Sequence, residues 1–280
     1  MPHTRAELAA ALSDLGLKAG GAVMIHASVR AIGPVFGGPD EIIRALEDAV
    51  APGGTLMMYV SCAFGFDDVG RNIMTPEEET VVRAHQPAFD FQTARANREF
   101  GALAEFFRST PGTICSEQVC ARMAARGARA AWLTADAPLS YGFGKASPLA
   151  KLCEADGQVL LLGSNHDEVT LLHHAEHIAD FPDKRIARYV VPLMRNGKRT
   201  WVPCEEFDTS ERAHENWPDK FFEQIVDDFI DRHDGTDACR TGRVGDADAV
   251  LIRAAKLVDH AVPIMVRQAL HTHAVPESAP

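Results

Sequence analysis

The chain has 280 residues, of which 46% are hydrophobic and 24% charged, and its formal net charge is −11 at pH 7. This length can bury a substantial core, and the acidic balance argues against nucleic acid or an anionic membrane as the main partner. Neither a signal segment nor an apolar run near the ~20 residues of a membrane span is visible. The six cysteines lack the spacing of a zinc knuckle. We therefore expect a cytoplasmic protein with reduced thiols.

Helices and strands alternate in the first part of the chain. Thr4 and Glu7 have the spacing of a capping box, and apolar residues follow them at helical intervals. Short apolar runs at 22–25 and 55–60 predict buried strands, and the apolar spacing within 39–50 predicts a helix between them. This alternation is typical of an α/β fold with a parallel sheet.

Residues 61–97 interrupt this pattern with a polar stretch that is long for a connection. We expect a lid or substrate-facing insertion, with some helix at 76–83. Beyond it, residues 157–163 are the clearest strand of the chain, and Asn196-Gly197 within 185–203 is a strong hairpin signal. The other predicted helices cover residues 100–108, 168–178, 220–232 and 246–260.

Residues 26–38 are the first candidate site, because small residues and glycines follow a buried strand and lead into a helix. Backbone N–H groups and the helix dipole favour an anion such as a phosphate at this position. A glycine pair before a helix is also an ordinary turn, so the spacing alone leaves both interpretations open.

A histidine-rich segment after the strand at 157–163 is the second candidate. His166 and Asp167 stand where open α/β sheets bind ligands, and an imidazole oriented by a carboxylate can act as a general base. A lone histidine can equally be structural. His173 and His177 lie four residues apart on a predicted helix and could share a metal ion, which would suit a metal-dependent hydrolase, although the sequence lacks the protease motif.

Four segments, taken in order, resemble the aminoglycoside 3-N-acetyltransferase family, also called the antibiotic acetyltransferase family. They are VMIHASVRAIG at 23–33, APGGTL at 51–56, FGKASPLAKL at 143–152, and GQVLLLGSNHD at 157–167 followed by HHAE at 173–176. The resemblance implies a single α/β domain over 1–280, distinct from the GNAT fold. It would have a central, mostly parallel sheet flanked by helices, an added antiparallel hairpin and the irregular insertion at 61–97.

The same resemblance implies transfer of acetyl from acetyl-CoA to the 3-amino group of the deoxystreptamine ring, and so antibiotic resistance. Transfer would occur in a ternary complex without an acyl-enzyme or a metal, in a monomer or homodimer. His166 matches the family's catalytic histidine. A nearby carboxylate would orient it, and Glu206 is the first candidate and Asp167 the second.

The resemblance also assigns ligand-binding residues. The predicted coenzyme site comprises His26, Ala27, Ser28, Val29, Arg30, Gly33, Val35, Phe36, Gly37, Ser147 and Pro148. The predicted site for the cationic antibiotic comprises Asp67, Asp68, Thr170, Glu176, Glu206 and Asp208. Two further alternatives remain open, an acetyltransferase of the same fold that acts on another amine and a non-catalytic binding protein.

Overall fold

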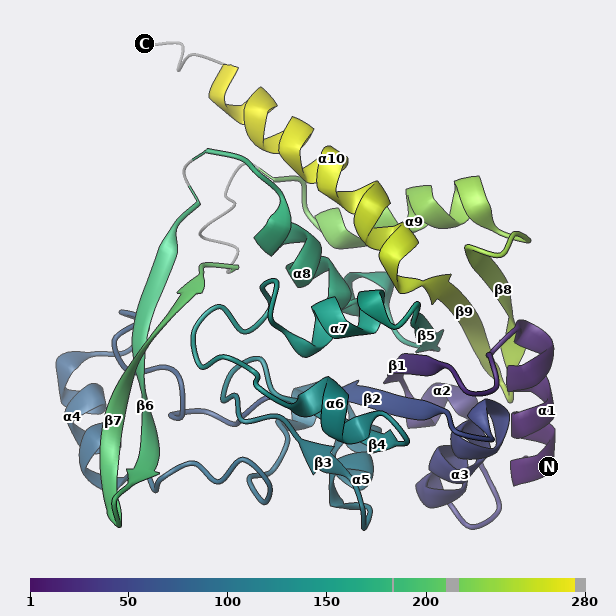
Figure 1. Cartoon of the computed structure of the whole chain (residues 1–280), viewed down its shortest axis with the longest axis horizontal. Helices are drawn as coiled ribbons and strands as arrows, with labels where there is room; N and C mark the ends of the chain where they lie inside the picture. Colours follow the sequence, from purple (N-terminus) through teal and green to yellow (C-terminus); the bar gives the residue numbers. More distant parts are fainter. Residues whose placement is uncertain (183, 210–216, 275–280) are drawn as a thin grey trace.

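The computed structural model describes residues 1–182, 184–209 and 217–274. Its main sheet contains β1 (Ala22–Ala27), β2 (Thr55–Tyr59), β3 (Ile114–Cys115), β4 (Met123–Gly127), β5 (Gln158–Leu162), β8 (Cys239–Val244) and β9 (Ala247–Arg253). Within the described residues the strand order is β3-β4-β2-β1-β5-β9-β8 (Figure 1). Only β1 with its neighbours β2 and β5 is parallel, and the pairs on both margins are antiparallel. The α/β prediction is confirmed, with its parallel strands at the centre.

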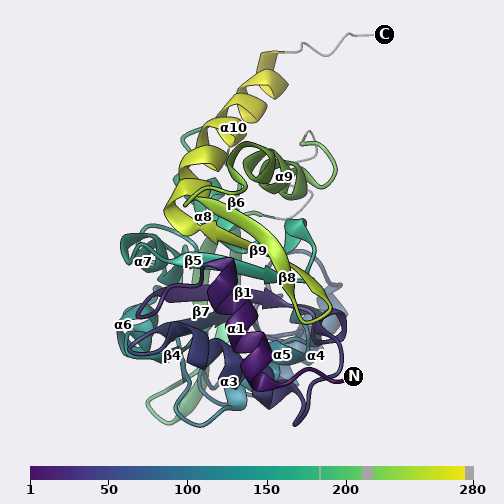
Figure 2. The same cartoon turned by 90° about the vertical axis from the view of Figure 1, so that its right-hand side faces the viewer.

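Helices cover both faces of this sheet (Figure 2). One face packs against α1 (Arg5–Leu15), α3 (Pro39–Val50) and α5 (Ala102–Ser109). The other packs against α6 (Ala130–Thr134), α7 (Pro148–Glu154), α8 (Leu171–Ile178), α9 (Phe221–His233) and α10 (Ala254–Ala274). Successive residues of β1 enter opposite cores, Val23 and Ile25 on one side and Met24 on the other, as the two-residue period of a strand requires. The predicted capping box of Thr4 and Glu7 opens α1.

A separate hairpin of β6 (Ile186–Arg195) and β7 (Lys198–Phe207) confirms the turn predicted at Asn196-Gly197. Both turn residues have positive φ, 50° and 75°, which matches the twist of a two-residue hairpin. The insertion at 61–97, which contains α4 (Pro76–His85), packs beside this hairpin (Figure 1). Its backbone is bonded to β6 at two places, where Phe89 N–H donates to Pro192 and Val190 N–H donates to Val69.

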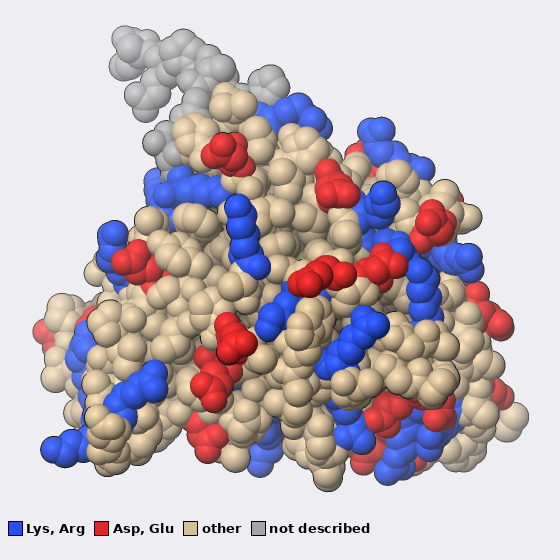
Figure 3. All heavy atoms as spheres, viewed as in Figure 1, with Lys and Arg blue, Asp and Glu red and all other residues tan. Residues whose placement is uncertain are grey.

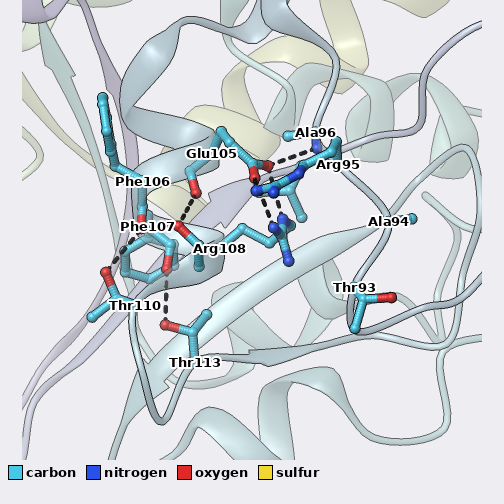
Figure 4. Close-up of polar contacts among 12 residues, drawn as sticks. Thr93, Ala94, Arg95, Ala96, Glu105, Phe106, Phe107, Arg108, Thr110 and Thr113 are labelled. Atoms are coloured by element: carbon cyan, nitrogen blue, oxygen red, sulfur yellow. Dashed lines mark hydrogen bonds and ion pairs between the residues drawn. The ribbon is translucent and has the colours of Figure 1, made fainter.

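The end of the insertion is fastened to α5 by one carboxylate (Figure 4). Glu105 accepts hydrogen bonds from the guanidinium groups of Arg95 and Arg108 and, at 2.9 Å, from the N–H of Ala96. Burial of Glu105 raises its pKa, but these donors outweigh burial and lower the pKa to about 2. The short helix η1 (Arg98–Phe100) therefore begins from a fixed position.

The helix predicted over residues 246–260 is wrong in its first half. Residues 247–253 form β9, which pairs with both β5 and β8, and the helix begins only at Ala254. Leu251 enters one core and Ile252 the other, so this strand is apolar on both faces. A short apolar run of this kind cannot be distinguished from a buried helix by its periodicity.

One face of the molecule is not uniformly acidic, although the net charge of the chain is −11. On the face shown in Figure 3, acidic and basic side chains are interspersed. On this face, any attraction of a cation must come from particular carboxylates and not from a uniform negative charge. In the part of the chain that the structure describes, no helix has the length and apolarity needed to cross a bilayer.

Candidate active site

A cavity of about 910 Å³ lies at the carboxyl ends of the parallel strands β1, β2 and β5. Its walls come from the end of β1 and the turn after it, the end of β2, the start of α5, and residues that follow β5. Open α/β sheets place their ligands at this end, and the volume falls in the usual range of ligand pockets. This cavity is the candidate active site.

The first group of predicted coenzyme residues lines the cavity. His26 and Ala27 end β1, Ser28 caps the short helix α2 (Val29–Ile32), and Val29 and Arg30 begin it. The Ser28 hydroxyl accepts a hydrogen bond from the Ala31 N–H at 3.2 Å, so this turn is held in place without a ligand. Arg30 is the basic side chain that this group brings to the cavity.

The remaining predicted coenzyme residues do not line this cavity: Gly33, Val35, Phe36, Gly37, Ser147 and Pro148. The segment after α2 is instead bonded to the N-terminus, where the Phe36 N–H donates to the carbonyl of His3 at 3.0 Å. Ser147 caps α7 by accepting from the Ala150 N–H at 3.1 Å. Cap formation accounts for Ser147, and Pro148 follows it at the first position of α7.

His173, on the first turn of α8, is the histidine of the HHAE motif that lines the cavity. Its Nδ1 lies 3.1 Å from Oε2 of Glu176, a carboxylate that is only 3% exposed. The rings of Phe143 and Phe222 each pack on the imidazole with centroids 5.1 Å apart. A carboxylate at Nδ1 favours the tautomer that carries its proton there, which leaves Nε2 as the basic nitrogen.

His166 has a different environment from the one predicted. It begins the short helix η2 (His166–Glu168), and its Nδ1 lies 2.6 Å from Oδ1 of Asp227 on α9. Asp167 and Glu168 line the cavity, whereas His166 is not among the lining residues. The carboxylate at its Nδ1 is therefore Asp227, and neither predicted candidate, Glu206 nor Asp167, holds that position.

Glu206 is instead buried at the end of β7. It accepts hydrogen bonds from the N–H of Gly142 at 2.6 Å and from its neighbour Phe207 at 3.1 Å. The Nε2 of His177 lies 3.1 Å from the same carboxylate, without the alignment of a hydrogen bond. Glu206 therefore joins the hairpin to the loop before α7. The prediction that it orients His166 is wrong, because Asp227 occupies the position at Nδ1 of His166.

The geometry also bears on the metal alternative. His173 lies against Glu176 and His177 against Glu206, so the two histidines have separate carboxylate neighbours. Among the residues that the structure describes, no group of three or more His, Cys, Asp or Glu side chains could hold a metal ion.

Several of the predicted antibiotic-binding residues are already engaged within the protein. Thr170 lines the cavity. The Asp67 carboxylate accepts a hydrogen bond from the Cys62 thiol at 3.2 Å. Burial raises the pKa of Asp67, and the positive charge of Arg71 partly offsets that rise. Asp68 accepts from the Gly65 N–H at 2.5 Å, and the backbone N–H of Asp208 donates to the carbonyl of Arg185.

The carboxylates of Asp67 in the insertion and Glu206 in the hairpin both act on the thiols of Cys120 and Cys204. Burial, with charge contributions from both carboxylates, raises the pKa of Cys120 to about 12 and that of Cys204 to about 11. The fold therefore brings together carboxylates from two segments that are far apart in the sequence.

Several residues of the site environment were not predicted from the sequence, and among them are three that contact His166 or His173. Asp227, Phe222 and Phe143 are supplied by segments distant from the motif that carries His166 and His173. Phe143 lies in one of the four segments that carry the family resemblance, which was the available signal. Asp227 and Phe222 lie in a helix whose pattern gave no indication of the site.

Comparisons with known proteins agree with this architecture. A family model described as aminoglycoside 3-N-acetyltransferase matches residues 24–266. Aminoglycoside N(3)-acetyltransferase III of Pseudomonas aeruginosa is 46% identical over 264 residues, covering 94% of this chain and 93% of the relative. The structure of AAC-IIIb with CoASH superposes over 100% of both chains, with 43% identity and a TM-score of 0.86. AAC-VIa bound to sisomicin, at 34% identity, covers 96% of this chain and 99% of its own, with a TM-score of 0.86. The chain therefore belongs to the aminoglycoside 3-N-acetyltransferase family.

Proposed function

We propose that this protein transfers the acetyl group of acetyl-CoA to the 3-amino group of the deoxystreptamine ring of aminoglycosides, which would confer resistance to them. The family membership supports the reaction, and the CoASH and sisomicin complexes of the related structures support the two substrate classes. The cavity at the ends of β1, β2 and β5 is the proposed site for the reacting end of acetyl-CoA.

His173 is the proposed general base, and its position carries the proposal. It lines the cavity, and the buried carboxylate of Glu176 lies at its Nδ1. His166 has an equally suitable imidazole, but it is not among the lining residues and its partner Asp227 is 54% exposed. A base must come within hydrogen-bond reach of the proton it removes, so the geometry favours His173 over the histidine first predicted.

The chemistry needs a base because the acceptor amine is protonated at neutral pH. Nε2 of His173 takes a proton from the ammonium group, and the freed lone pair attacks the thioester carbonyl carbon. The C–N bond forms and the C–S bond breaks, and the acylated nitrogen releases its remaining surplus proton to solvent. The coenzyme A thiolate takes up the proton from the imidazolium. The negative charge of Glu176 stabilises the imidazolium between these two steps.

Direct transfer is supported by two observations on the potential nucleophiles at the cavity: the serine hydroxyls are bonded to the backbone, and no cysteine is among the residues described as lining it. The Ser28 hydroxyl caps α2, and the Ser164 hydroxyl donates to the carbonyl of His26 at 3.3 Å. None of the residues described as lining the cavity is a cysteine. An acyl-enzyme would require a nucleophile activated by the base, so we infer a ternary complex.

The carboxylates near the hairpin and the insertion fit a cationic acceptor. Asp167 and Glu168 line the cavity itself, and the charges of Asp67 in the insertion and Glu206 in the hairpin both act on Cys120. Carboxylates in a partly enclosed site attract and orient a polycation more strongly than carboxylates on an open surface. The insertion at 61–97 is thus proposed to face the acceptor.

Thiol release from acetyl-CoA by the purified protein tests this function. Release should depend on an added deoxystreptamine antibiotic, and mass spectrometry with NMR of the product should locate the new amide at the 3-amino position. Release that occurs only with unrelated amines would favour the alternative acetyltransferase. An absence of release with either class, in protein shown to bind coenzyme A, would contradict the proposal.

A further inference from the structure

Helix α9 contacts the active-site histidines at two points. The ring of Phe222, in its first turn, packs edge-on against the imidazole of His173 with centroids 5.1 Å apart. Five residues later, Asp227 accepts the 2.6 Å hydrogen bond of His166. The position of α9 therefore affects the proposed base directly through Phe222, and it is linked to η2 through Asp227.

The turn η2 has weak internal bonds. The N–H of Glu168 lies 3.3 Å from the carbonyl of Asn165, and the Asn165 amide lies 3.3 Å from the Glu168 carboxylate. Both distances exceed the usual 2.9–3.0 Å of a protein N–H···O bond. Neither η2 nor the following helix α8 has a side-chain cap at its N-terminus. The short His166–Asp227 bond is thus the strongest polar link described for this turn.

The link also lies beside the cavity without being part of its wall. Asn165, Asp167 and Glu168 line the cavity, and His166 between them does not. Its side chain is 30% exposed and that of Asp227 is 54% exposed, so the pair can be altered without opening the hydrophobic core. Helix α9 is also held by its residues Phe221, Ile225, Val226 and Phe229, which are buried in the core. In addition, His260 of α10 lies 3.1 Å from Asp228. Loss of the first link should shift α9 and not unfold it.

We propose that His166 is a positioning residue whose hydrogen bond with Asp227 holds α9 against η2 and so keeps Phe222 packed on His173. This inference rests on the proposed function, in which His173 is the base. A displacement of about 1 Å in a catalytic group can cost about 10²-fold in rate, and a partial release of α9 should cost less. We expect kcat to fall about 10-fold when the pair is broken.

The test is a double-mutant cycle of His166→Leu and Asp227→Ala, measured as kcat and KM for acetyl-CoA and for the antibiotic. His166→Asn is the conservative variant, because its amide nitrogen stands close to the place of Nδ1 and can donate to Asp227. Arg232→Ala is the matched control, since it removes the Arg232–Asp228 ion pair on the same helix without touching η2. Thermal unfolding of each variant and a His173→Asn variant complete the set.

The expected result is a similar loss of kcat in His166→Leu and Asp227→Ala. Both KM values should stay within about twofold of the wild type, because neither residue contacts a substrate. The double variant should lose no more than either single one, because each change removes the same link. His166→Asn should recover most of the rate, and Arg232→Ala should keep it.

Three outcomes would overturn the inference. Unchanged kcat in both single variants would show that the link does not act on the base, and additive losses would show that the two residues act separately. A loss in His166→Leu as large as in His173→Asn, with Asp227→Ala active, would make His166 a base in its own right. If His173 is not the base, so that the proposed mechanism itself fails, His173→Asn will retain its turnover whatever the His166 variants do.

Discussion

Two histidines that lie close together in the chain, His166 and His173, are each paired with a carboxylate, and the two pairs differ in burial and in origin. His173 and Glu176 lie on one turn of α8, and the carboxylate is 3% exposed. His166 and Asp227 come from separate elements, and that carboxylate is 54% exposed. A charge interaction strengthens as water is excluded, so Glu176 can stabilise an imidazolium far better than Asp227 can. The surroundings of the carboxylate therefore distinguish the proposed base from the proposed positioning residue.

Replacing the proposed base should have the largest effect. His173→Asn keeps an amide nitrogen near Glu176 but removes the basic Nε2, so kcat should fall by about 10²–10⁴-fold. Coenzyme A affinity should change little, which equilibrium titration of the variant would check. A variant that keeps its turnover would end the distinction between the two pairs.

Removing the charge beside the base should have the next largest effect. Glu176→Gln preserves the shape of the buried side chain but can no longer stabilise an imidazolium, and we expect kcat to fall by about 10²-fold with KM little changed. Steady-state kinetics with both substrates varied would measure this. An increase of KM alone would instead assign Glu176 to binding of the antibiotic.

His26 extends the comparison to a histidine whose Nε2 is buried and has no hydrogen-bond partner among the described residues. Burial lowers its pKa from 6.5 to about 4. Between these values the unfolded chain binds a proton that the folded chain does not. The free energy of unfolding should therefore fall as the pH drops from 6.5 towards 4, by at most about 1.4 kcal/mol per pH unit.

Urea denaturation of the wild type and of His26→Gln, at pH 7 and pH 5, would measure that effect. Glutamine does not titrate, so the variant should lose less stability between the two pH values. Equal losses in both proteins would show that His26 does not contribute to this acid sensitivity.

Glu105 provides the corresponding contrast for a carboxylate paired with arginines. Its pKa of about 2 lies below the ordinary 4.5, so its stabilisation is present above pH 4.5 and is lost as the pH falls towards 2. Glu105→Gln should lower the free energy of unfolding at pH 7 by about 1–2 kcal/mol. Glu79→Gln is the control. It breaks a pair with Arg83 inside the insertion that is more exposed than the Glu105–Arg108 pair, and it should cost about 0.5 kcal/mol or less. Equal denaturation midpoints for the two variants would contradict the anchoring role of Glu105.

Features determined by neighbouring residues could be predicted from the sequence alone. The capping box of Thr4 and Glu7, the Asn196-Gly197 turn and the buried strand at 158–162 all appear as predicted. Each depends on a few adjacent residues whose hydrogen bonds or backbone angles are set locally. The four family segments likewise identified the family and the first wall of the cavity, from His26 to Arg30.

Features that depend on contacts between distant residues were decided only by the tertiary structure. Asp227 took the place expected for Glu206 because α9 packs on η2, while Glu206 is bound by the backbone of Gly142. Residues 247–253 became a strand because β5 and β8 offered partners on both sides. Backbone pairing and burial outweigh local propensity when the partners lie far apart in the chain, and no local pattern records which partner will be there.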